Sequence, residues 1–100
     1  MGAGLTDRRL LTEQRLFDVH TRLERARGEL AIVEERMLRA DEAASEAHAR
    51  AAASETPLAS SEWCKARRRR EQLVERANAA RAAVAELEAA RDELLGKLVG

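Results

Sequence analysis

The stretch Ser54-Glu55-Thr56-Pro57-Leu58-Ala59-Ser60-Ser61 decides how this chain folds. It holds the only proline of the sequence, and a proline cannot donate the backbone hydrogen bond that a helix interior needs. Proline also disfavours the helical conformation at the residue before it, so a preceding helix is expected to end near Ala53 or Ser54. A second helix begins either at Pro57, with Thr56 as its cap, or at one of the serines that close the stretch. We take residues 54–60 as the turn.

The residues before this turn carry an unbroken apolar stripe. Steps of three and four residues alternate from Leu16, and the stripe lasts for five heptad repeats, which is typical of a coiled coil. The sequence therefore predicts a first helix over residues 6–53, after a flexible N-terminus at residues 1–5. The positions of the stripe are Leu16, Val19, Leu23, Ala26, Leu30, Val33, Met37, Ala40, Ala44, Ala47 and Ala51.

The residues after the turn repeat the stripe with two arginines in it. An arginine can lay its methylene stem along an apolar surface while its guanidinium stays in water, so both are compatible with the pattern. A second helix is expected over residues 61–98. The positions are Trp63, Ala66, Arg70, Leu73, Ala77, Ala80, Val84, Leu87, Arg91, Leu94 and Leu98.

Two long amphipathic helices joined by so short a connection must lie antiparallel and adjacent. The predicted fold is thus all-α: an antiparallel two-helix coiled-coil hairpin, forming a single domain. Two registers remain open, in which the numbers of facing residues sum to about 117 or to about 110. The first places Leu30 against Leu87, and the second places Met37 against Leu73.

Composition narrows the classes of function. The 18 basic and 18 acidic residues cancel, and 21 of the 45 hydrophobic residues are alanine, so a thick globular core is excluded. No apolar run reaches the roughly 20 residues that cross a bilayer, and we expect no membrane contact. Because Cys64 is the only cysteine, no internal disulfide can form, and we expect a cytoplasmic protein. The abundance of alanine and arginine suggests a bacterial source.

The sequence offers no catalytic pattern. It contains no glycine-rich phosphate loop and no recognisable nucleophilic triad, and Cys64, His48 and His20 lack the tight spacing of a zinc site. A helical hairpin also provides no deep cleft in which to orient a general base. We therefore expect no enzyme activity, no cofactor, no metal and no small-molecule ligand.

Several apolar residues lie outside the stripes. Leu10, Phe17, Ala31 and Leu38 share one heptad position, on the side of the first helix that faces away from the stripe. They predict a second face that is buried in an oligomer, either a homodimer that forms a four-helix bundle or a complex with another helical protein. The alternative is that they are isolated apolar residues on the surface. We take Leu10, Phe17 and Leu38 as candidate contacts.

A basic run follows the turn, at Lys65, Arg67, Arg68, Arg69 and Arg70. Arginines neutralise phosphates and the nearby Trp63 is suited to stack on a base, so nucleic acid is an alternative partner. Four consecutive arginines, however, point to different sides of a helix. Ion pairs with the acidic residues that approach the turn are the simpler interpretation. Trp63, Arg67, Arg68 and Arg69 are the candidate contacts at this end.

The segment Ser54-Glu55-Thr56-Pro57-Leu58-Ala59, between an alanine-rich and an arginine-rich helix, resembles the turn of small coiled-coil hairpin proteins of actinobacteria. That resemblance covers the turn alone and implies no activity. The helical pair of a cyclic-di-GMP-dependent anti-sigma factor is a second comparison, but its motif is met here only at Glu62 and Arg69. We therefore expect no dinucleotide binding.

These observations favour a non-enzymatic interaction, scaffold or adaptor protein that acts through self-association or through a helical partner. The alternative is a regulator associated with nucleic acid or transcription, including one that binds a protein as anti-sigma factors do. In that alternative the arginine-rich start of the second helix makes the contact.

Overall fold

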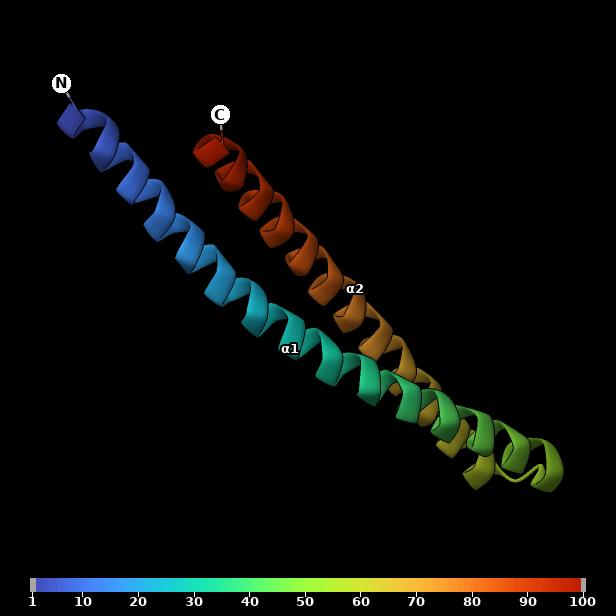
Figure 1. The fold of residues 1–100 in the computed structure, drawn as a ribbon. Helices are drawn as coiled ribbons and strands as arrows, with labels where there is room; N and C mark the ends of the chain where they lie inside the picture. The colour runs from blue at the N-terminus through green and yellow to red at the C-terminus, as the bar shows by residue number, and fades with distance from the viewer. Residues whose placement is uncertain (1, 100) are drawn as a thin grey trace. The chain divides into compact units, whose positions relative to one another are not determined.

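The computed structural model describes residues 2–99 of the chain, and the side chains within that range except those of residues 2, 3 and 5. It consists of two helices, α1 (Gly2–Ser54) and α2 (Pro57–Val99), and the described residues contain no strand. The two helices pack against each other in opposite directions (Figure 1). The predicted all-α helical hairpin is confirmed.

Helix α1 begins earlier than the sequence predicts. Residues 2–5, which we expected to belong to a flexible segment, are helical, and the remaining residue of that segment lies outside the described part of the chain. Extending an existing helix by one residue is far less costly than nucleating a new one. No proline stands before Thr6, so the segment lacks the residue that would end the extension most strongly, although Gly2 and Gly4 have low helix propensity.

The end of α1 has the geometry of a left-handed C-cap. Glu55 follows the last helical residue and has a φ of 48°, the only positive φ of a non-glycine residue in the described part of the chain. Its backbone N–H donates to the carbonyl oxygen of Ala51 at 3.0 Å, which satisfies one of the free carbonyls at the helix end. The chain thus leaves α1 through a single residue.

Helix α2 begins directly after Thr56, so the turn holds two residues outside the helices rather than the seven that we predicted. The hydroxyl of Thr56 accepts a hydrogen bond from the backbone N–H of Ala59 at 3.1 Å, and its carbonyl accepts one from the N–H of Ser60 at 3.1 Å. These are the bonds of a helix N-cap followed by proline at the first helical position. The start at residue 61 was wrong, and the alternative start at Pro57 is the one that the structure has.

The heptad stripes are the buried surfaces of both helices. Every stripe position of α1 is buried or half-buried, and on α2 only Arg70 is exposed. Alanine predominates among the buried residues, which lets the two backbones approach closely. The buried residues are Leu23, Ala40, Ala44, Ala47, Ala59, Leu73, Ala77 and Val84.

The chain divides into two compact units. One consists of residues 29–79 and contains the turn, and the other consists of residues 1–28 and 80–100 and contains the two chain ends. We call them the turn unit and the terminal unit. The core of the turn unit is mostly alanine, whereas that of the terminal unit contains Leu23 and Val84.

The contacts in the turn unit fix its register. His48 faces Trp63, and Asp41 pairs with Arg70; in both pairs the residue numbers sum to 111. The register with sums near 110 is therefore the one adopted there. In the terminal unit, Arg27 reaches Glu88 at 3.4 Å through two long side chains.

Neither helix contains, within its described residues, a segment long and apolar enough to span a bilayer.

Candidate interaction surfaces

Trp63 lies at the centre of a small cluster in the turn unit. Its half-buried ring is 4.6 Å from the ring of His48, centroid to centroid, at an angle of 53° between the ring planes. The guanidinium carbon of Arg67 lies 5.2 Å from the centroid of the same ring, within the range of a cation–π contact. Trp63 is therefore engaged inside the hairpin, and its ring is not a free platform for a base.

The four consecutive arginines of α2 have different surroundings. Arg67 lies against Trp63, and the Nε of Arg70 is 3.6 Å from Oδ1 of Asp41 on α1. Arg68 is exposed, and no ion pair is found for it within the described residues. Arg69 lines a groove together with residues of α1. The basic run is thus not one surface, as its angular spread of about 100° per residue indicates.

The hairpin has two flanks, one on each side of its buried stripe. On one flank of the turn unit, a groove is lined by Ala44, Ser45, His48, Trp63, Arg67 and Arg70. Here the pair of Asp41 and Arg70 places opposite charges across the two helices. This flank is already occupied by contacts within the chain.

The other flank of the turn unit is basic. Its groove, of about 410 Å³, is lined by Arg36, Arg39, Ala40, Ala43, Ala66 and Arg69. Arg39 donates to Glu35 at 2.8 Å, one turn earlier on α1, whereas no ion pair is found for Arg36 or Arg69 in the described part of the chain. The lining of this groove thus consists of three arginines and three small alanines.

Sequence reasoning found Arg69 but missed its two neighbours on α1. Arg36 directly precedes the stripe residue Met37, and Arg69 directly precedes the stripe residue Arg70. In an antiparallel pair these equivalent positions lie on the same flank. The heptad phase would have placed Arg36 and Arg69 on one flank, and the register near 110 would have placed them about 9 Å apart along the helix axes.

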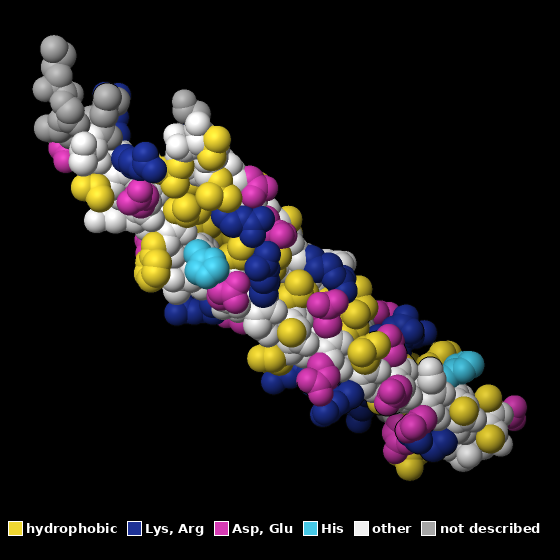
Figure 2. All heavy atoms as spheres, viewed as in Figure 1, with side chains coloured by type: hydrophobic (Ala, Val, Ile, Leu, Met, Phe, Trp, Pro, Cys, Tyr) yellow, Lys and Arg dark blue, Asp and Glu magenta, His cyan; other side chains and the backbone are white. Residues whose placement is uncertain are grey.

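In the terminal unit, Phe17 projects from α1 with 72% of its surface exposed. It lines two grooves. One lies along α1 and includes Leu10, and the other includes Leu16 of α1 and Leu95 of α2. Hydrophobic side chains lie open on the surface of this end of the molecule, as Figure 2 shows. Leu38 is also exposed, at 62%, but belongs to the turn unit.

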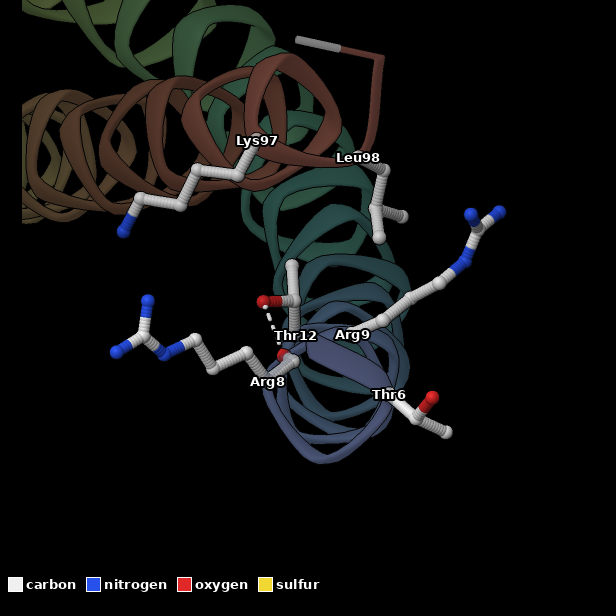
Figure 3. Close-up of a pocket in the computed structure, with 6 residues that line it drawn as sticks. All are labelled: Thr6, Arg8, Arg9, Thr12, Lys97 and Leu98. Carbon is white, nitrogen blue, oxygen red and sulfur yellow. Dashed lines mark hydrogen bonds between the residues drawn. The ribbon is translucent and has the colours of Figure 1, made fainter. Parts of the chain in front are cut away.

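A further groove lies between the outer ends of the helices, where Thr6, Arg8, Arg9, Thr12, Lys97 and Leu98 form its walls. Figure 3 shows the side chains of Arg8 and Lys97 extending on one side and that of Arg9 on the other. Arg9 is 3.3 Å from Glu13, one turn further along α1. The hydroxyl of Thr12 donates to the carbonyl of Arg8 at 2.9 Å, a bond within the helix.

The described residues hold no cluster of three or more His, Cys, Asp or Glu side chains that is suited to a metal ion. The thiol of Cys64 is free and exposed. Among the polar atoms of described side chains, none is buried without a hydrogen-bond partner.

Comparisons with protein-family models, with curated proteins and with solved structures find no match to this chain.

Proposed function

We propose that this protein is a non-enzymatic interaction module that associates with a second copy of itself through the apolar surface around Phe17. One observation carries the proposal: Phe17 is 72% exposed and lines two grooves of the terminal unit. An apolar side chain that projects beside a groove can insert into the same groove of a second copy, as side chains of packed helices do. The surface is thus suited to contact its own copy across a two-fold axis.

The apolar content of the surface supports this partner. A buried phenylalanine removes about 150–250 Å² from water, and burial stabilises by about 25 cal/mol per Å². Leu10, Leu11 and Leu95 add further exposed apolar area in the same unit. Glu13 and Arg91 border the groove with opposite charges, so the rim of this surface can be electrostatically complementary to that of a second copy.

Sedimentation of the purified chain at tens of micromolar tests this proposal. The wild-type chain is expected to sediment as a dimer or larger species, and Phe17→Glu is expected to sediment as a monomer, because a carboxylate would be placed in an apolar contact. Leu58→Glu is the matched control, since Leu58 is 70% exposed in the turn unit. It should leave association unchanged.

Two results would reject this proposal. The first is a wild-type chain that sediments as a monomer at tens of micromolar. The second is an equal loss of association in the Phe17 and Leu58 variants, because that would place the contact elsewhere. Circular dichroism of both variants shows whether the helices themselves persist.

A further inference from the structure

We infer that the basic groove of the turn unit binds the phosphodiester backbone of a double-stranded nucleic acid. We call the groove residues Arg36, Arg39 and Arg69, together with Arg76, the basic flank. Arg76 follows Arg69 by one heptad on α2 and so points to the same side of the helix. This inference is independent of self-association, because Phe17 and its grooves belong to the terminal unit.

The charge arrangement of the basic flank is the first argument. Antiparallel helices ordinarily place opposite charges across their flanks, as Asp41 and Arg70 do on the other side of this unit. On the basic flank, Arg36 of α1 and Arg69 of α2 line one groove with no acidic side chain among its lining residues. Like charges facing each other oppose the pairing of the helices. A bound anion removes that repulsion.

The second argument is that the guanidinium groups remain available. Within the described residues, no ion pair or hydrogen bond is found for the side chains of Arg36, Arg69 or Arg76. Arg39 holds Glu35 but is exposed. Arginine binds phosphate oxygens with two parallel N–H donors, and these groups are free to do so.

The residue types that line the groove favour a nucleic acid over a lipid surface. Helices that bind membranes place large apolar side chains beside their basic residues. Here the other residues that line the groove are Ala40, Ala43 and Ala66, which offer little to insert between lipids. A double-stranded nucleic acid requires only cations along its backbone, with no apolar insertion.

The absence of an aromatic side chain from the groove favours a duplex over a single strand. Proteins that bind single strands stack the bases on aromatic rings. Trp63, the only tryptophan, is in contact with His48 and Arg67 on the opposite flank. The expected binding is therefore independent of base sequence and strongly dependent on salt.

Fluorescence anisotropy of a labelled duplex DNA of about 20 base pairs, titrated with the full chain at about 50 to 200 mM salt, tests the inference. The Arg36→Gln/Arg69→Gln double variant is expected to bind about tenfold or more weakly, and its slope of log affinity against log salt should fall by about 2. Glutamine retains good helix propensity, so both helices should persist, as circular dichroism can show.

The matched control is the Lys65→Gln/Arg68→Gln double variant. It removes the same number of charges from exposed side chains of the same unit, but outside the groove. Its affinity should change by less than about threefold, since the phosphate contacts remain.

Three results would overturn the inference. They are no binding of the duplex by the wild-type chain at about 50 mM salt, an equal loss in the two double variants, and binding to vesicles that contain phosphatidylserine without binding to the duplex. Equal losses would show that net charge, and not this groove, attracts the nucleic acid. Vesicle binding alone would assign the flank to a membrane.

Discussion

The hydroxyl oxygen of Thr56 accepts a hydrogen bond from the backbone N–H of Ala59 at 3.1 Å, and this bond caps the start of α2. The residue before Thr56 is Glu55, which follows the end of α1 in a left-handed conformation. The direction of the chain is therefore reversed by two residues with complementary geometry. Glu55 provides the left-handed conformation, and Thr56 caps the helix that Pro57 begins. The turn stabilises both helix ends at once.

Removing this cap should destabilise the hairpin. Thr56→Ala is expected to lower the free energy of unfolding by about 0.5 to 2 kcal/mol, because the N–H of Ala59 loses its acceptor. Thr56→Ser keeps a hydroxyl at the same place and should remain within about 0.5 kcal/mol of the wild type. Urea denaturation followed by circular dichroism measures both. Equal stability of the alanine and serine variants would mean that the cap contributes nothing.

Replacing Glu55, the residue before Thr56, should increase the stability of the hairpin. A left-handed conformation costs a residue with a Cβ roughly 1–2 kcal/mol, a cost that glycine avoids, although glycine also loses more freedom on folding. Glu55→Gly is therefore expected to raise the free energy of unfolding by about 0.5 to 1 kcal/mol. Glu55→Ala keeps the Cβ and should give no gain. A glycine variant no more stable than the alanine variant would contradict the observed φ of 48°.

The buried stripe predicts a large difference between two aliphatic residues of α1. Leu23 has 0% exposure, and Leu23→Ala should cost about 2 to 5 kcal/mol because it leaves a cavity. Ile32 is mostly exposed, and Ile32→Ala should change stability by less than about 0.5 kcal/mol. Chemical denaturation of both variants at one protein concentration makes the comparison. Similar losses of stability in the two variants would mean that Leu23 does not belong to the buried core.

The ion pair between Asp41 and Arg70 should contribute little to stability. The two side chains are 48–50% exposed, and exposed pairs give about 0.2 to 1 kcal/mol. A double-mutant cycle with Asp41→Asn and Arg70→Gln should return a coupling energy in that range, and the coupling should decrease as salt screens the charges. A coupling that persists at about 1 M salt would contradict the observed exposure.

Much of the fold could be predicted because the heptad stripe can be recognised from the sequence alone. All stripe positions of α1 are at least half-buried, as the apolar spacing indicates. The start of α2 was missed because three residues near the turn, Thr56, Ser60 and Ser61, are all able to cap a helix. The choice among them was made by Pro57, whose fixed φ suits the first helical position.

The candidate surfaces were less predictable, because they depend on register. Phe17 was identified from its heptad position alone, and it is exposed. Arg67 and Arg69 lie on opposite flanks of the turn unit, as the angular spread of consecutive helical residues predicts. The partner of Arg69 in its groove, Arg36, is distant in sequence and becomes its neighbour only when the chain folds back.

The central claim is that the chain folds back on itself at Glu55 and Thr56 within one molecule. Spin labels at Leu38→Cys and Glu71→Cys, in a Cys64→Ser background and diluted with unlabelled chains, test it by pulsed electron–electron distance measurement. The two sites are 33 residues apart in the sequence, a span of about 50 Å along an unbroken helix. Because packed helices have axes about 8–10 Å apart, a hairpin predicts a distance well under about 30 Å. A distribution centred near 50 Å, or a short distance that disappears on dilution, would contradict the account.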